Sequence, residues 1–98
     1  MRRSYRRAGR LIPASAGRLR SRSVILKSGG LVDWHSTGAR EELLIGISGT
    51  ATLEYRAGRR GLRRAALAAG SCLFLPRRVE HRVVNRSRRM AHYLYITG

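Results

Sequence analysis

The chain has 98 residues and a formal net charge of +16 at pH 7, from 21 basic and five acidic residues. A chain of this length forms one small domain with a modest hydrophobic core. It contains no apolar run near the roughly 20 residues that a membrane-spanning helix needs, so we expect no membrane partner.

The positive charge is chemically uneven, because every basic residue except Lys27 is an arginine. Such a preference for arginine over lysine indicates a general amino-acid bias of the source rather than selection for phosphate contacts. Proteins that bind single-stranded nucleic acid place base-stacking aromatic residues among their basic residues. The arginines here are not interleaved with aromatics, and we therefore do not expect nucleic acid as a partner.

The first 22 residues contain eight arginines and no acidic residue. Like charges in such a run repel one another, and the run buries little apolar surface. We therefore predict two parts: a flexible arginine-rich extension over residues 1–22 and a folded domain over residues 23–98. The single cysteine, Cys72, cannot form an intramolecular disulfide, which is typical of a reducing compartment and predicts a cytoplasmic location. Its apolar neighbours predict that Cys72 is buried.

From residue 23 onward, short β-rich runs alternate with glycine- and proline-containing turns. Seven or eight short strands at near-even spacing are typical of an all-β sandwich or barrel. The predicted strands are residues 23–27, 32–37, 43–48, 50–55, 62–67, 72–75, 81–85 and 91–97.

Three side chains in or next to predicted strands carry the most specific chemistry in the chain. His35, Glu42 and His81 supply two imidazoles and one carboxylate. This is a ligand set for a divalent transition metal with open coordination positions. Glu41 is adjacent to Glu42, but it is expected to face away from the cavity because side chains alternate along a strand.

The first stretch has a glycine, Gly29, followed after five residues by His35 and one residue later by Thr37. Glu42 follows after four more residues and Gly49 after a further six. This spacing resembles the first motif of the cupin superfamily, in which a second histidine stands at the position of Thr37.

The second stretch has Gly70, then Pro76 after five residues, His81 four residues beyond, and Asn85 after three more. It resembles the second cupin motif, which has a glycine where this chain has Arg78. The resemblance covers both motifs and extends with the flanking strands over about residues 23–98.

The resemblance implies a single-domain cupin, a double-stranded β-helix or jelly-roll barrel, with a metal held between its sheets by His35, Glu42 and His81. Iron, manganese, nickel or zinc would fit this set. It implies a protein that binds or converts a small organic ligand inside the barrel. If the protein is an enzyme, a metal-dependent oxygenase or isomerase is expected; the alternative is a metal-free binding or sensor cupin without catalysis.

Further expectations concern the rest of the barrel. Thr37 shares the His35 face and is expected to line the cavity. His92 is a candidate replacement ligand, although a structural role is favoured for it. Tyr93 and Tyr95 share a face that could line a cavity mouth, although packing on the outer sheet is favoured for them. Trp34 is expected to pack away from the site. The apolar stripe of Leu43, Ile45 and Ile47 points away from the cavity and predicts a homodimer, because monomers rarely expose such a stripe.

Overall fold

The computed structural model describes residues 3–98, which form nine strands and one short 3₁₀ helix, η1 (Gly58–Arg60). No helix in this part of the chain is long and apolar enough to cross a membrane. The strands are β1 (Gly9–Arg10), β2 (Arg20–Leu26), β3 (Leu31–Ser36), β4 (Glu42–Ser48), β5 (Thr50–Arg56), β6 (Leu62–Ala68), β7 (Cys72–Leu75), β8 (Glu80–Val84) and β9 (Ala91–Thr97).

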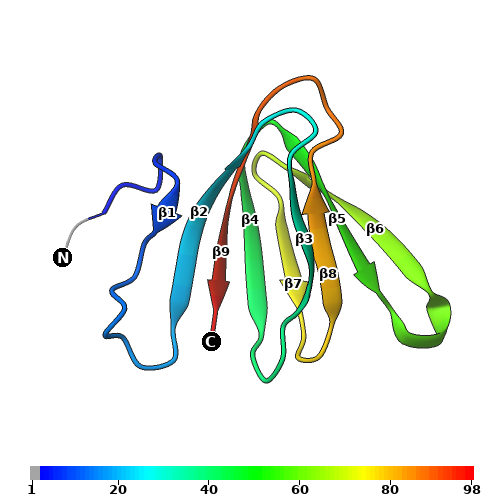
Figure 1. Cartoon of the computed structure of the whole chain (residues 1–98), viewed down its shortest axis with the longest axis horizontal. Coiled ribbons are helices and arrows are strands. Elements are labelled where there is room, and N and C mark those ends of the chain that lie inside the picture. Colours follow the sequence, from blue (N-terminus) through cyan, green and yellow to red (C-terminus); the bar gives the residue numbers. More distant parts are fainter. Residues whose placement is uncertain (1–2) are drawn as a thin grey trace.

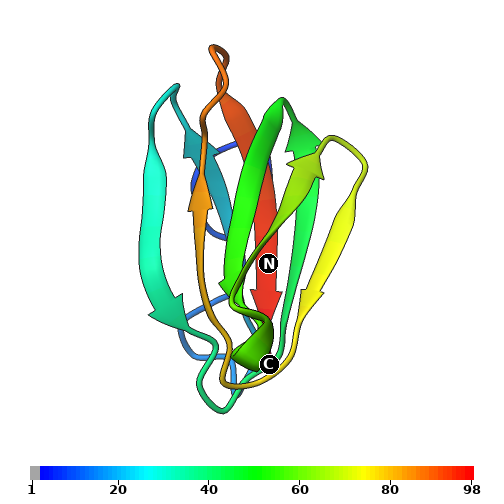
Figure 2. The same ribbon diagram turned by 90° about the vertical axis from the view of Figure 1, so that its right-hand side faces the viewer.

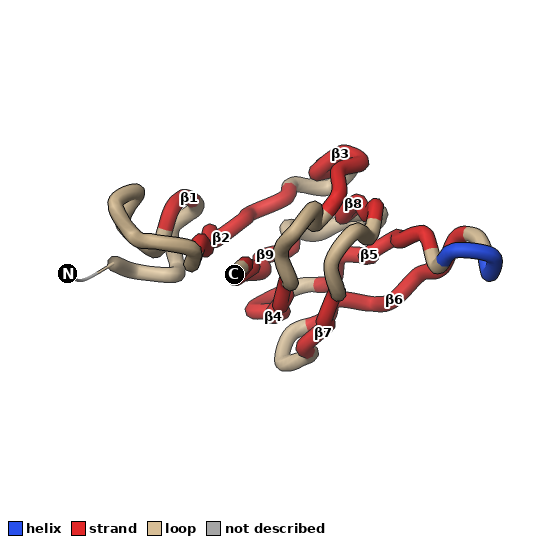
Figure 3. The backbone as a smooth tube through the Cα atoms, turned by 90° about the horizontal axis from the view of Figure 1, so that it is seen from below, coloured by secondary structure: helices blue, strands red, loops and turns tan. Residues whose placement is uncertain are grey.

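The strands form two antiparallel sheets that lie face to face, as the expected all-β barrel requires. Sheet A has the order β1-β2-β9-β4-β7, and sheet B has the order β3-β8-β5-β6. Figure 1 and Figure 2 show that the strands of both sheets run along roughly the same axis, and Figure 3 shows the two layers from below. Sequence neighbours such as β2 and β3 lie in different sheets, so the chain crosses repeatedly between the layers.

The core fills the space between the two sheets. Along each strand, alternate side chains point inward: in β4, Leu44 is 1% exposed while Leu43 and Ile45 on the other side are half-buried. This alternation is the period-2 pattern of a strand with one buried face. The buried apolar residues that form the core are Leu26, Leu44, Ala51, Leu53, Leu67, Leu75, Val83, Ala91 and Tyr93.

The outer face of sheet A carries the apolar stripe that the sequence indicated. Leu43 lies opposite Ile96 of β9 and Phe74 of β7, and Ile45 lies opposite Leu94. Directly opposed residues lie on the same face of a sheet, so these side chains form one apolar surface, which we call the outer apolar face. Phe74 is its most exposed member, at 59%.

The N-terminal boundary differs from the expected one. β2 begins at Arg20 rather than at residue 23, and the two residues of β1 pair with it at the edge of sheet A, where Gly9 lies opposite Ser23. The alternating pattern Ser21, Ser23 extends the strand backward because both serines are buried and hydrogen-bonded. The flexibility of residues 1–22, of which residues 1 and 2 lie outside the described part, stays a prediction.

Cys72 is exposed, so the expectation that it is buried was wrong. β7 is an edge strand, and its four residues alternate: Leu75 points into the core, whereas Cys72 and Phe74 point outward. A continuous apolar run does not reveal which of its residues face the core, because an edge strand can expose apolar side chains on one face.

Four motif positions have a left-handed backbone: Gly29, Gly49, Gly70 and Arg78. Gly49 has φ 65°, and a Cβ there would overlap the carbonyl oxygen of Met90, so only glycine fits. Arg78 occupies the position of the second-motif glycine and still has φ 57°. The left-handed turn is therefore kept without the residue that adopts it at least cost.

Candidate metal centre

The two sheets bring the three predicted ligands together at one end of the barrel. His35 on β3 lies directly opposite His81 on β8 in sheet B, and Glu42 begins β4 in sheet A. Their candidate ligand atoms all lie within 4.8 Å of one another, and the two imidazole rings are 4.1 Å apart at their centroids. His81 and Glu42 are buried, His35 is exposed, and Glu41 is exposed as expected.

Backbone carbonyls orient both imidazoles. The Nδ1 atom of His81 lies 3.0 Å from the carbonyl oxygen of Val79, and Nδ1 of His35 lies 2.8 Å from that of Asp33. A carbonyl oxygen only accepts, so each Nδ1 carries the hydrogen and donates it. Each Nε2 then keeps its lone pair, which is the form of histidine that binds a metal.

The Nε2 atom of His81 has no hydrogen-bond partner, although it is fully buried. It lies 3.3 Å from Oε2 of Glu42, so with Nδ1 protonated an imidazole lone pair faces a carboxylate. Two acceptors this close repel unless a cation stabilises them. Burial lowers the pKa of His81, but the contacts with Glu42 and Val79 outweigh burial and raise this pKa above its ordinary value. The pair therefore attracts positive charge, either a proton or a metal ion.

Thr37 lies beside the site, as expected, but its hydroxyl is bonded to the backbone. Its Oγ1 donates to the carbonyl oxygen of Pro76 at 2.7 Å and accepts the N–H of Val79 at 3.0 Å. The N–H of Thr37 also donates to the carbonyl of Val79, the same oxygen that orients His81. Thr37 therefore ties the β3–β4 loop to the β7–β8 turn. It also holds the Val79 carbonyl that orients the imidazole of His81.

A pocket of about 240 Å³ opens onto the triad between the edge strand β3 and strand β9. Its walls include Tyr93 and Tyr95, so the cavity-lining alternative is confirmed and the favoured outer packing was wrong. Burial and the charge of Glu42 raise the pKa of Tyr93, which keeps its hydroxyl protonated near the carboxylate. The remaining lining residues are Val32, His35, Ser36, Thr37, Arg40, Glu42, His81, Val83 and Thr97.

Sequence reasoning missed Arg40 and favoured the wrong face for both tyrosines. Arg40 lies in the loop before β4, which begins at Glu42, so strand alternation does not place its side chain and no local pattern marks it as a pocket residue. The tyrosines depend on the register between β9 and β4, where Tyr95 lies opposite Leu44. That register joins residues far apart in the chain, and no local pattern encodes it.

His92 does not join the site. It lies outside the barrel, where its Nε2 atom contacts the hydroxyl of Ser23 at 2.5 Å. Ser23 Oγ in turn donates to the carbonyl of Tyr5 in the N-terminal segment. His92 therefore has the structural role that was favoured for it. The prediction that it could replace a ligand was wrong, because neighbouring Tyr93 takes the inward position on β9.

The outer face of sheet B is held together by arginines. Trp34 packs there, away from the site as expected, with the guanidinium carbons of Arg56 and Arg82 at 4.5 and 5.1 Å from its ring centroid. Beside it, the buried carboxylate of Glu54 accepts hydrogen bonds from Arg64, Arg82 and Arg86. Part of the arginine excess therefore stabilises this face.

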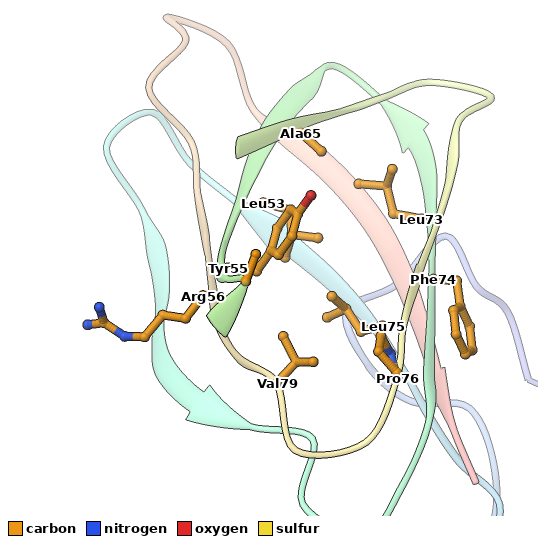
Figure 4. Close-up of a pocket in the computed structure, with 10 residues that line it drawn as sticks. Leu53, Tyr55, Arg56, Ala65, Leu73, Phe74, Leu75, Pro76 and Val79 are labelled. Carbon is orange, nitrogen blue, oxygen red and sulfur yellow. The ribbon is translucent and has the colours of Figure 1, made fainter. Parts of the chain in front are cut away.

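A second cavity of about 270 Å³ lies between β5 and β7, at the opposite seam of the barrel. Figure 4 shows that Leu53, Leu73, Leu75 and Val79 surround the ring of Tyr55, while the side chain of Arg56 extends away from them. This cavity is lined mainly by apolar side chains and contains none of the three candidate ligands. Of these two cavities, only the pocket beside β3 contains the candidate metal ligands.

Solved structures share this fold. The chain matches TT1209 from Thermus thermophilus with a TM-score of 0.77 and 19% identity, over 100% of this chain and 89% of that one. It matches a Cupin 2 conserved barrel domain protein from Salinispora arenicola CNS-205 with a TM-score of 0.75 and 22% identity, over 93% and 73%. It also matches an oxalate oxidase in complex with the substrate analogue glycolate, with a TM-score of 0.73 and 17% identity over 81% of this chain.

The chain spans only 41% of the length of that oxalate oxidase, so this likeness concerns the fold. A search of curated proteins gives no match. The sequence profile of the cupin domain family matches residues 22–97, which include both motifs and the three candidate ligands. The chain therefore belongs to the cupin domain family.

Proposed function

We propose that this protein is a small metal-binding cupin that holds a divalent transition metal through His35, Glu42 and His81 and binds a small organic ligand in the adjacent pocket. The observation that carries the proposal is the buried Nε2 atom of His81, which has no hydrogen-bond partner and faces Glu42. A cation between them would relieve this unfavourable contact.

The donor set supports the same proposal. Two imidazole nitrogens and one carboxylate oxygen suit iron, manganese, nickel or zinc, and three protein ligands leave coordination positions open. The pocket reaches these residues from outside the barrel, so a ligand has access. When bound, such a metal supplies a Lewis acid, or with iron a centre for oxygen chemistry, which are the oxygenase and isomerase possibilities named above.

The residues around the triad would prepare it for this role. The carbonyls of Val79 and Asp33 hold both imidazoles in the metal-binding tautomer, and Tyr93 presents a protonated hydroxyl to the pocket. We include the cytoplasmic location and the homodimer in this proposal. The single exposed Cys72 would stay reduced there, and the outer apolar face offers a surface for self-association.

Metal titration of purified, chelator-treated protein by calorimetry tests the proposal. The unaltered chain should bind one equivalent of Zn²⁺ or Mn²⁺, and His81→Ala and Glu42→Gln should lower its affinity at least about tenfold, as loss of a direct ligand requires. His92→Ala is the matched control, because His92 lies outside the barrel. Negligible binding by every protein would leave the metal-free binding or sensor cupin as the function.

A further inference from the structure

The pocket beside the triad contains one side chain of permanent positive charge. Among the described residues that line it, Arg40 is the only arginine, and the lining includes no lysine. Arg40 is half-buried at the start of the run that leads into β4. A guanidinium inside a pocket that also holds a metal-ligand set is a recognition group for an anion.

Arg40 is held in place, yet it keeps most of its hydrogen-bonding capacity. Its Nη1 atom donates to the carbonyl of Arg18 at 2.9 Å and lies 3.4 Å from the hydroxyl of Thr97. A guanidinium has five N–H donors, and in residues 3–98 these contacts use only one of its nitrogens. Its Nη2 and Nε atoms have no hydrogen-bond partner among the described residues.

No carboxylate neutralises Arg40 within the described part of the chain. The arginines that pair with acids there are Arg56, Arg64, Arg82 and Arg86, all on sheet B or in the loop after it. The one acid in the pocket, Glu42, faces His81. Burial of a charge is stabilised by pairing, so an anionic ligand would stabilise the half-buried guanidinium of Arg40.

A second arginine lies on the same face of sheet A. Arg22 of β2 lies directly opposite Tyr95 of β9, and Tyr95 lines the pocket. Directly opposed residues share a face of a sheet, so Arg22 adds positive charge near the pocket and favours the approach of anions.

The geometry points to a small carboxylate as the ligand of this pocket, with Arg40 as the group that binds its carboxylate; the inference rests on the proposed function. A planar guanidinium with two adjacent free nitrogens matches the two oxygens of one carboxylate. A volume of about 240 Å³ lies below the range of about 300–1,000 Å³ for drug-sized ligands. Val32, Val83 and the tyrosines leave room for a short apolar or hydroxylated body directed toward the triad.

The test compares carboxylates with their uncharged amides. Acetate, lactate and benzoate, each beside acetamide, lactamide or benzamide, are titrated into ¹⁵N-labelled full-length protein, both metal-free and Zn²⁺-loaded. At least one carboxylate should bind at least about tenfold tighter than its amide and shift the amide signals of Tyr95 and Thr97. Equal binding of every pair, or tighter binding of inorganic phosphate than of every carboxylate, would overturn the inference.

Two variants locate the binding. Arg40→Gln should weaken the best carboxylate at least about tenfold, and Arg40→Lys should weaken it less because the charge remains without the planar fork. Arg56→Gln is the control, since Arg56 forms a surface pair on the other sheet. An unchanged affinity in Arg40→Gln would contradict the assignment.

Zn²⁺ affinity measured on the same samples separates the two proposals. Arg40→Gln should change it less than about twofold, because Arg40 is not one of the candidate ligands. If Zn²⁺ binds and no carboxylate does, only the carboxylate inference fails. If carboxylates bind through Arg40 and Zn²⁺ does not, the metal proposal fails and the pocket is a metal-free anion site.

Discussion

The hydroxyl of Thr37 accepts the N–H of Val79 at 3.0 Å and so ties the β3–β4 loop to the β7–β8 turn, a set of contacts that we call the Thr37 clasp. The same hydroxyl donates to the carbonyl of Pro76, and the carbonyl of Val79 orients His81. Thr37 stands where the resembled motif has a histidine, and its bonds fix the turn whose carbonyl orients His81. These two hydrogen bonds of Thr37 join residues that are 39 and 42 positions apart in the chain.

Replacing Thr37 tests this clasp. Thr37→Val keeps the shape but leaves a carbonyl and an N–H without partners, which should lower the free energy of unfolding by about 1–3 kcal/mol. Thr37→Ser keeps the hydroxyl and should cost about 1 kcal/mol or less, for the lost methyl group. Urea denaturation of both variants measures the difference. Equal losses in the two would show that the methyl group and not the hydroxyl matters.

The sequence indicated the three candidate ligands but not the hydrogen bonds of Thr37. His35, Glu42 and His81 could be singled out because motif spacing surrounds each of them. The bonds of Thr37 reach a turn that no local pattern connects to it. Restoring the motif histidine there would therefore break the clasp as well as add an imidazole.

The other differences have related causes. Strand positions were predicted closely, since alternation and turn residues are local signals. The facing of β9 was not, because the inward position of Tyr93 follows from pairing with strands β2 and β4. The exposure of Cys72 follows from the edge position of β7, and an edge is a property of the whole sheet order.

Arg78 offers a stabilising substitution. It has φ 57°, and a left-handed conformation costs a residue with a Cβ about 1–2 kcal/mol, part of which glycine loses again through its freedom in the unfolded chain. Arg78→Gly should raise the free energy of unfolding by about 0.5–1 kcal/mol without changing metal affinity. Arg77→Gly, next to it, is the control and should not stabilise. A loss of stability in Arg78→Gly would mean that its side chain makes a favourable contact.

Glu54 predicts a loss of stability in acid. The hydrogen bond from Arg64 is the largest influence on it; burial opposes this, and Arg86 and Arg82 help to lower its pKa from 4.5 to about 2. The folded pKa lies below the unfolded one, so its contribution is complete above about pH 4.5 and is lost as pH falls toward 2. Glu54→Gln should remove much of this pH dependence in denaturation experiments between pH 2 and 6.

Glu80→Gln is the matched control for Glu54, because Glu80 forms a single pair with Arg56 at the surface. Exposed ion pairs contribute little to the free energy of unfolding, so Glu80→Gln should keep the loss of stability in acid. If the two variants have the same pH profile, Glu54 does not hold the outer face of sheet B as described.

The outer apolar face predicts a homodimer. Pairing two such faces about a two-fold axis would cover Phe74 and its neighbours, so light scattering at micromolar concentration should give about twice the chain mass. Ile45→Arg should produce a monomer, because a charge would enter the centre of the contact. Ala66→Arg, on the exposed face of sheet B, should stay dimeric. A monomeric unaltered protein would refute this interface.

The central claim is that His35 and His81 bind the same metal ion. Pulsed electron paramagnetic resonance of Cu²⁺-loaded protein counts the imidazoles coordinated to the ion. We predict two in the unaltered protein, one in His35→Ala and one in His81→Ala, and two in His92→Ala. A single imidazole or none in the unaltered protein, or a loss of one in His92→Ala, would contradict the account.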